Sequence, residues 1–214
     1  MSKLVISIDD NIIFKLFQQS SLMPPCMLKI GWLQVLAATA ATTFAGHMLD
    51  VKLFDTPDKV YKIVSDLTHH FEPAFLSVHA AGGREMLNAA YAAAAGTNTE
   101  LFAVGVMTTD HAARGIEELS RNVELATMAL ETGINYLSCS MDSVHFLKTM
   151  FPALKLIVPG IRMGNSDLRM VKDHARVHEP TDRRVDYYVV GRPITQSAAP
   201  FVEAKRYFDV IDAL

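Results

Sequence analysis

The sequence predicts an α/β protein folded as a (β/α)8 or TIM barrel, with residues 1–214 forming a single domain. Two observations lead to this prediction: eight short apolar runs recur along the chain, and segments of helical character lie between them. The runs are almost continuously apolar, which is typical of parallel strands covered on both faces, and eight of them alternating with helices suit a closed barrel. An open doubly wound sheet is the alternative. No G-x-G-x-x-G motif follows the first run, which disfavours its dinucleotide-binding version.

The expected strands are short and rich in β-branched and aromatic residues. They comprise residues 4–9, 26–31, 47–54, 75–80, 101–107, 136–140, 154–161 and 185–192. Helices are clearest in three of the intervening segments. Residues 84–96 and 111–133 have helical patterns that end on a glycine, and residues 197–214 form a final amphipathic helix.

Composition disfavours several classes of protein, among them nucleic-acid binders, disulfide-rich proteins and membrane proteins. The formal net charge is −3, which does not suggest a general binder of nucleic acid or of acidic membranes. Two cysteines inside apolar runs imply no disulfide framework. The N-terminus lacks the pattern of a signal peptide, and the longest mostly apolar stretch, residues 31–46, is shorter than the ~20 residues of a membrane span. We therefore expect a cytoplasmic protein with no nucleic-acid or membrane partner.

The stretch "LDVKLFD" places charged residues near the end of the third expected strand. Asp50 and Lys52 lie two residues apart, so they share one face of that strand, and Lys29 lies on the preceding strand. With Asp55 just beyond the strand, these residues form an alternating Lys–Asp–Lys–Asp array, in which each charge offsets the desolvation of its neighbour. The alternative is an ordinary exposed ion pair on an edge strand. In a barrel, the carboxyl ends of the strands carry the chemistry, which favours a reaction centre here.

A second candidate site lies at the end of the last strand, in "VVGRPIT", residues 189–195. The strand runs into Gly191 and Arg192, and a helix follows shortly. Backbone N–H groups, the room left by a glycine and a guanidinium fork suit a phosphate group. The alternative is an arginine that only pairs with a helix carboxylate.

Other polar residues have ordinary structural interpretations. His79 is more often a core histidine than a catalyst, and Ser140 could simply bond the backbone. His69 and His70 lack convergent partners, so no metal site is expected. One group of charged residues is expected to form a solvent-exposed helix face, namely Glu117, Glu118, Arg121 and Glu124.

These motifs together resemble the orotidine 5′-phosphate decarboxylase family, in its bacterial branch. "LDVKLFDTP" resembles the Asp-x-Lys-x-x-Asp signature of that family. Further matching motifs follow in the expected order along nearly the whole chain: "ISIDD", "LKIG", "VHAAGG", "VPGIR" and "VDYYVVGRPIT". The resemblance implies a homodimeric, cofactor-independent enzyme that converts orotidine 5′-monophosphate (OMP) to uridine 5′-monophosphate (UMP) in pyrimidine biosynthesis.

The resemblance also implies a role for each matching residue. Lys52 would protonate C6 of the pyrimidine, and Asp50 would lie beside the substrate carboxylate. The ribose would be bound by Asp9, Lys29 and, from the partner subunit, Asp55. Two residues would lie at the pyrimidine, Ser140 and Thr108, and three would hold the phosphate, Arg162, Gly191 and Arg192.

Two alternatives remain open from the sequence. One is a sister-family sugar-phosphate decarboxylase or aldolase, which needs a divalent metal held partly by the signature acids. The other is a non-catalytic nucleotide-phosphate binder that has kept the barrel but lost turnover. "PGIR" and "GRPIT" favour the decarboxylase over the first, and the intact Lys29, Asp50, Lys52 and Asp55 set disfavours the second.

Overall fold

The computed structural model describes residues 2–39, 42–110, 115–164 and 178–214, and within them eight parallel strands close into a barrel in chain order. The strands are β1 (Leu4–Ile8), β2 (Met27–Ile30), β3 (Met48–Leu53), β4 (Phe75–His79), β5 (Glu100–Val104), β6 (Tyr136–Ser138), β7 (Lys155–Val158) and β8 (Tyr187–Val190). Pairing of β1 with β8 closes the ring. The predicted barrel is therefore confirmed. Seven of the expected strands contain the observed one, and β5 begins one residue before its expected range of 101–107.

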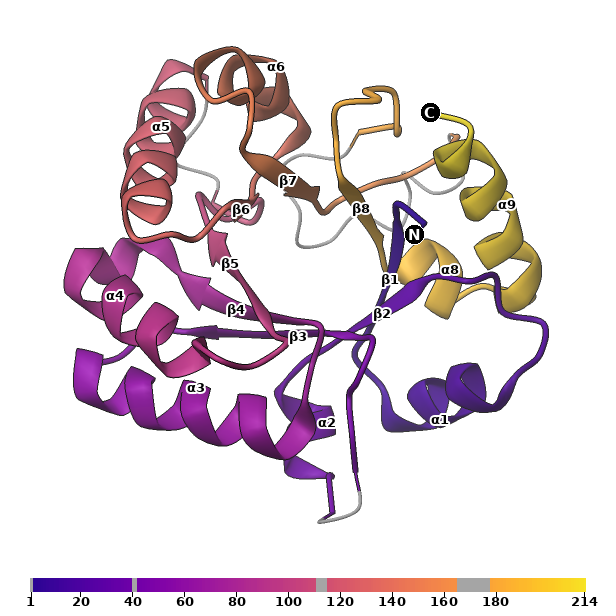
Figure 1. Ribbon diagram of the computed structural model, residues 1–214. Coiled ribbons are helices and arrows are strands. Elements are labelled where there is room, and N and C mark those ends of the chain that lie inside the picture. The colour runs from indigo at the N-terminus through magenta and orange to yellow at the C-terminus, as the bar shows by residue number, and fades with distance from the viewer. Residues whose placement is uncertain (1, 40–41, 111–114, 165–177) are drawn as a thin grey trace.

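Helices surround the barrel on its outside (Figure 1). They are α1 (Asn11–Gln19), α2 (Trp32–Leu36), α3 (Pro57–Phe71), α4 (Gly83–Ala94), α5 (Ile116–Glu131), α6 (Met141–Met150), α8 (Arg192–Thr195) and α9 (Pro200–Asp212), with a 3-10 turn at Ala80–Gly82. The three helices expected from the sequence are present, although residues 111–114 of one of them lie outside the described residues. No helix in the described ranges combines the length and the apolar character needed to cross a bilayer.

Helix α3, which follows β3, has clear start and stop signals in the sequence. Pro57 stands at its first position, where the missing N–H costs nothing, and Glu72 ends it in the left-handed conformation. Val60, Val64 and Phe71 recur at helical spacing and are buried against the barrel. The helix thus begins directly after Asp55 and fixes the exit of β3.

Side chains alternate between two apolar layers along the strands. The outer layer, between strands and helices, is the larger core and includes Leu49, Val51 and Leu53 of β3. The inner layer fills the lumen with Val5, Met27, Met48, Phe75, Phe102, Val104, Tyr136, Ile157 and Val189. The lumen is therefore a packed core towards the amino ends of the strands, where Lys155 donates to the hydroxyl of Tyr136. Towards the carboxyl ends it is lined by the charged residues Lys29, Asp50 and Lys52.

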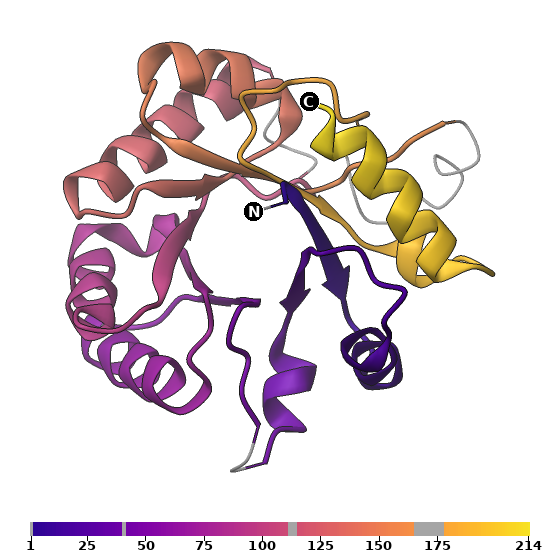
Figure 2. The ribbon, with the colours of Figure 1, turned by 45° about the vertical axis from the view of Figure 1, so that its right-hand side comes forward.

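The two ends of the chain meet beside β1. Ser2 donates from its hydroxyl to Oδ1 of Asp212 at 2.9 Å, which ties the start of β1 to the end of α9. Figure 2 shows α9 lying along the barrel beside the strand that carries the N-terminus. Closure of the barrel by β8 is thus reinforced by the last helix.

Candidate active site

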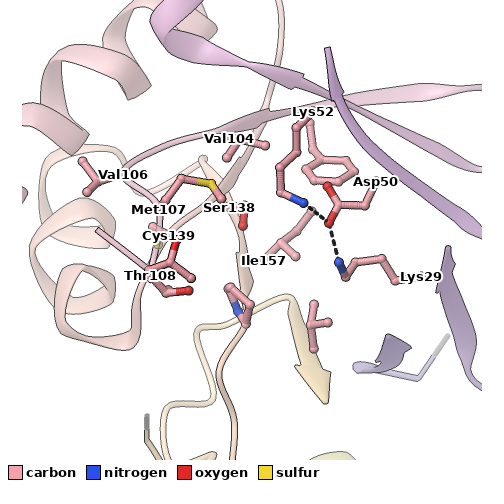
Figure 3. Close-up of a pocket in the computed structure, with 14 residues that line it drawn as sticks. Lys29, Asp50, Lys52, Val104, Val106, Met107, Thr108, Ser138, Cys139 and Ile157 are labelled. Atoms are coloured by element: carbon pink, nitrogen blue, oxygen red, sulfur yellow. Dashed lines mark hydrogen bonds and ion pairs between the residues drawn. The ribbon is translucent and has the colours of Figure 1, made fainter. Parts of the chain in front are cut away.

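Three charged side chains from β2 and β3 meet in the lumen at the carboxyl ends of the strands (Figure 3). The ammonium groups of Lys29 and Lys52 both donate to the same oxygen, Oδ2 of Asp50, and Nζ of Lys52 lies 2.6 Å from it. The side chain of Asp50 is only 7% exposed, against 17% for Lys29 and 37% for Lys52. The ion pairs are therefore interior, which excludes the alternative of an ordinary exposed pair on an edge strand.

The electrostatics of Asp50 favour its charged form. Burial alone raises the pKa of a carboxyl group, but the charges and hydrogen bonds of Lys29 and Lys52 outweigh it and hold the pKa of Asp50 below its usual range. The second oxygen, Oδ1, is buried and accepts no hydrogen bond from the described residues. Asp50 is thus a fixed anion between two ammonium groups, with one oxygen still available.

A cavity of about 250 Å³ opens over this triad. Lys29, Asp50 and Lys52 form its charged wall (Figure 3). The rest of the lining is mainly apolar with a few hydroxyl groups, and includes Val104, Val106, Met107, Thr108, Thr109, Ser138, Cys139 and Ile157. A flat, partly polar ring could lie against this lining with one edge towards the ammonium groups.

A second cavity of about 200 Å³ shares Lys29, Pro159 and Val189 with the first. Its polar lining includes Asp9, Arg162 and Arg192 beside the backbone of Gly160 and Gly191. Arg162 is 2% exposed and donates from Nη1 to the carbonyl oxygen of Ile161 at 2.7 Å, so its guanidinium is held in place. The two cavities therefore adjoin, and the second has three cationic side chains in its lining, Lys29, Arg162 and Arg192.

Comparison with known proteins identifies the family. The model of the orotidine 5′-phosphate decarboxylase / HUMPS family matches residues 14–207. The chain belongs to this family. It is 38% identical over 167 residues to the orotidine 5′-phosphate decarboxylase of Sphingopyxis alaskensis, covering 73% of this chain and 72% of that protein. The enzyme of the same name from Methylacidiphilum infernorum is 36% identical over 164 residues, covering 72% and 69%.

Solved structures agree on the fold of this member of the orotidine 5′-phosphate decarboxylase / HUMPS family. The crystal structure of the orotidine 5′-phosphate decarboxylase from Lactobacillus acidophilus superposes with a TM-score of 0.74 at 21% identity, covering 99% of this chain and 100% of that one. An uncharacterized conserved protein from Geobacillus kaustophilus gives a TM-score of 0.70 at 22% identity, with coverage of 95% and 97%.

Most of the predicted site residues of this decarboxylase-family barrel line the two cavities. The first is lined by Lys29, Asp50, Lys52 and Thr108, and the second by Asp9, Lys29, Arg162, Gly191 and Arg192. Asp55 and Ser140 line neither. The carboxylate of Asp55 is 42% exposed, accepts from the N–H of Thr56 at 2.7 Å and lies 3.5 Å from Nζ of Lys59.

Ser140 belongs to a buried polar network that the sequence did not reveal. Its hydroxyl donates to Oε1 of Glu118 at 2.5 Å, and Asn122 of the same helix accepts from the N–H of Val106 at 2.8 Å and donates to Ser143 at 2.9 Å. Glu118 is 1% exposed, so its assignment to a solvent-exposed helix face was wrong. The physical reason is that the hydroxyl groups of α6 supply donors that a buried carboxylate requires.

The network holds the segment after β5, whose residues Thr108 and Thr109 line the first cavity. Thr109 and Ser138 are cavity residues that the sequence analysis did not select. Ser138 could have been found, because it precedes Ser140 by two positions on the same strand end. The sequence does not indicate the role of Asn122, because a single asparagine within a helical pattern is common and does not show which residues it contacts.

His79 stands at the end of β4, close to the charged wall. Its Nδ1 accepts from the N–H of Ala81 at 3.3 Å, and its ring packs edge-on against Phe54. Burial and then the nearby charges of Lys52 and Arg121 hold the pKa of His79 below its usual value. The side chain of His79 thus caps the 3-10 turn, and its surroundings favour the neutral imidazole.

No group of three or more His, Cys, Asp or Glu side chains in the described residues is arranged to hold a metal ion. The chemistry of the donor set at the triad also fits a cation poorly. Asp50 already binds two ammonium groups, which repel a divalent ion.

Proposed function

We propose that this protein decarboxylates OMP to UMP without a cofactor, as a cytoplasmic homodimer. The observation that carries the proposal is the pair of ammonium groups on one oxygen of buried Asp50, at the edge of a cavity sized for a small ring. Membership of the orotidine 5′-phosphate decarboxylase / HUMPS family supports it, as do the relatives named orotidine 5′-phosphate decarboxylase.

Lys52 would supply the proton. As the bond between C6 and the carboxylate carbon breaks, its electron pair stays on C6 and carbon dioxide leaves. The ammonium of Lys52 stabilises this developing negative charge and transfers a proton to C6, and water later restores the proton on Nζ. Lys52 suits this role because it is the more exposed of the two lysines and is held by a fixed anion.

Asp50 would act by holding both ammonium groups and by its own charge. Its Oδ1 has no hydrogen-bond partner in the described residues, so a substrate carboxylate placed beside that atom would meet a carboxylate oxygen that no donor satisfies. That repulsion is relieved as carbon dioxide leaves, whereas the attraction between C6 and Lys52 grows. Both effects lower the barrier without requiring tighter binding of the substrate.

The second cavity would bind the phosphate and ribose. Arg192, Arg162 and the Gly191 backbone would hold the phosphate, and Asp9 and Lys29 would bond the ribose hydroxyl groups. Lys29 lines both cavities, so it would connect the ribose to the reaction centre. Phosphate binding at this distance from C6 supplies energy that can be used at the reacting carbon.

Thr108 would lie at the pyrimidine, where it lines the first cavity. The hydroxyl of Ser140 donates to Glu118, so a contact with the pyrimidine would use its oxygen as an acceptor. Asp55 would reach the ribose of the partner subunit, and its exposure leaves it accessible to a second copy of the chain.

The metal-dependent sister activity is disfavoured by the same triad. An acid that serves a divalent ion needs an oxygen facing that ion without competing cations, and both neighbours of Asp50 are ammonium groups. A non-catalytic nucleotide binder has no need for a buried Lys–Asp–Lys array, which costs desolvation energy.

The loss of OMP absorbance with purified protein, with and without a chelator, tests the proposal. We expect turnover that resists the chelator and that falls by at least about 1,000-fold in Lys52→Ala. Lys205→Ala is the matched control, because Lys205 is an exposed lysine on α9, far along the chain from the triad, that pairs with Asp209 and lies over the ring of Phe208. Binding of UMP without any turnover of OMP would contradict the proposal, and so would turnover of a sugar phosphate alone.

Arg192→Ala tests the phosphate site separately. We expect KM for OMP to rise by about 10- to 100-fold, because a charge-assisted contact to the phosphate is lost. Orotidine, which lacks the phosphate, should be turned over equally by the variant and by the unchanged protein. A larger effect on orotidine than on OMP would place Arg192 elsewhere in the mechanism.

A further inference from the structure

The pairing of β3 with β4 is irregular in the segment that carries Asp50 and Lys52. In the pairing of β3 with β4, Leu49 lies opposite Leu76 and Leu53 lies opposite Val78. The chain advances by four residues on β3 between these two pairs, but by only two residues on β4. Strand β3 therefore carries two additional residues in a bulge that spans Asp50 to Lys52. The bulge brings both charged residues to the level of a single residue of β4, Ser77.

Lys52 adopts a backbone conformation within this bulge that lysine rarely takes. Its φ is +47°, in the left-handed region, and Glu72 at a helix end is the other non-glycine residue with positive φ in the described part of the chain. A bulged residue in this conformation has lost its regular ladder partner, so its N–H needs another acceptor.

Ser77 provides that acceptor. Its Oγ accepts from the N–H of Lys52 at 2.6 Å, and the residue is completely buried. Ser77 lies two positions after Phe75, whose ring is part of the inner layer, so its side chain also points into the lumen. Val78 belongs to the outer core layer and cannot take this role.

We infer that Ser77 is a positioning residue for Lys52: its hydroxyl fixes the left-handed bulge that aims the ammonium at Asp50 and at the reacting carbon. Ser77 lines neither cavity, so it acts through Lys52 rather than on the substrate. The inference rests on the proposed function for its kinetic consequence, whereas the backbone contact stands independently of any activity. A misplacement of about 1 Å at a reacting group can lower turnover 100-fold.

The test uses Ser77→Ala, which removes the acceptor, and Ser77→Cys, which keeps the size of the side chain but accepts weakly. We expect kcat for OMP to fall by about 10- to 100-fold in Ser77→Ala while KM changes by less than about threefold, since the binding groups are untouched. Ser77→Thr, which restores a hydroxyl, should recover part of kcat.

Thr99→Val is the matched control. Thr99 is 9% exposed and its hydroxyl donates to the carbonyl oxygen of Pro73, at the opposite end of β4. This variant also loses a buried hydrogen bond, but it should keep kcat and KM. An equal fall of kcat in Thr99→Val and Ser77→Ala would mean that any buried defect has this effect, and the inference would be overturned.

Hydrogen exchange of the Lys52 amide separates this inference from the proposed function. We expect the amide to be protected in the unchanged protein and to exchange at least about tenfold faster in Ser77→Cys, whether or not OMP is a substrate. Unchanged protection in Ser77→Cys, or an unchanged kcat in Ser77→Ala, would overturn the inference. Should Ser77→Ala fail to fold, Ser77→Cys carries both measurements.

Discussion

Nζ of Lys52 lies 2.6 Å from Oδ2 of Asp50, although the two residues are separated by only one position on the same strand. Strand alternation brings both side chains into the lumen, and the bulge of β3 adjusts the separation. The carboxylate accepts from Lys29 through the same oxygen, so the position of each lysine depends on one acid.

Asp50→Asn should therefore impair both turnover and stability. Two interior ammonium groups would then face each other without their anion. We expect the free energy of unfolding to fall by about 3 kcal/mol. This value is at the lower end of the range for a broken buried ion pair, because Lys52 is partly exposed. Turnover of OMP should fall by about 100- to 1,000-fold. Urea denaturation and the absorbance assay measure the two effects.

Asp209→Asn is the control for Asp50→Asn. Asp209 is 55% exposed and pairs with Lys205 on α9, and we expect less than about 0.5 kcal/mol from its loss. If Asp50→Asn were as stable and as active as this control, the central role of Asp50 would be refuted.

The imidazole of His79 should report the charge of Lys52. Its pKa lies below the usual value through burial, then through Lys52 and Arg121. In Lys52→Ala the coulombic contribution of Lys52 disappears, so the pKa should rise towards its usual value, as measured by NMR titration of the ring protons. A pKa of His79 that does not move would show that Lys52 is neutral or remote.

The same shift sets a pH dependence of stability. The unfolded chain binds a proton at His79 more readily than the folded protein does. Stability from this group is therefore complete above about pH 6.5 and is lost as the pH falls below that value towards the lower pKa of the folded state. His79→Gln should reduce the slope of unfolding free energy against pH below about pH 6.5, and a slope that stays unchanged would assign it to other groups.

The proposed dimer makes a prediction about mixed subunits. If Asp55 serves the partner's site, Asp55→Ala and Lys52→Ala are each inactive alone, but a mixed dimer contains one site with both residues intact. After mixing and re-equilibration, we expect about a quarter of the original turnover to return. Absence of recovery, together with sedimentation as a monomer, would place Asp55 outside the catalytic site.

Stability should depend on the opposite end of the barrel. Phe75 is 6% exposed, and its ring contacts Tyr136 and Tyr187 edge-on, with centroids 5.0 and 5.4 Å away. Phe75→Ala should lower the free energy of unfolding by about 3–5 kcal/mol, and the folded fraction should keep its KM and kcat. Phe146→Ala, at an exposed position on α6, is the control and should cost less than about 1 kcal/mol. A changed KM in folded Phe75→Ala would show that the two ends of the barrel are coupled.

The strands could be predicted because their signal is local. Each apolar run reflects burial on both faces, which a parallel barrel imposes on every strand. The sequence predicted carboxyl ends for two strands that lie beyond the observed ends. The expected strand 101–107 extends past the end of β5 at Val104, and the expected strand 154–161 extends past the end of β7 at Val158. Apolar residues continue past these ends because they line the cavity, so periodicity alone does not show where the pairing stops.

The site could be predicted only in part. Asp50, Lys52 and Lys29 follow from strand alternation and neighbouring strands, both of which are visible in the sequence. The burial of Glu118 depends on hydroxyl groups 22 and 25 residues away, and such distant partners leave no local pattern. The bulge at Lys52 was equally hidden, because no glycine or asparagine marks the left-handed position.

At the left-handed position of Lys52, the residue that would be best for stability differs from the residue that the proposed reaction requires. Glycine adopts such a backbone without the ~1–2 kcal/mol that a side chain costs there, so the fold alone would prefer glycine at residue 52. A lineage released from selection for turnover should therefore drift away from lysine here sooner than at Asp50 or Lys29. The identity of residue 52 then serves as a marker of whether a barrel of this kind is still under selection for its chemistry.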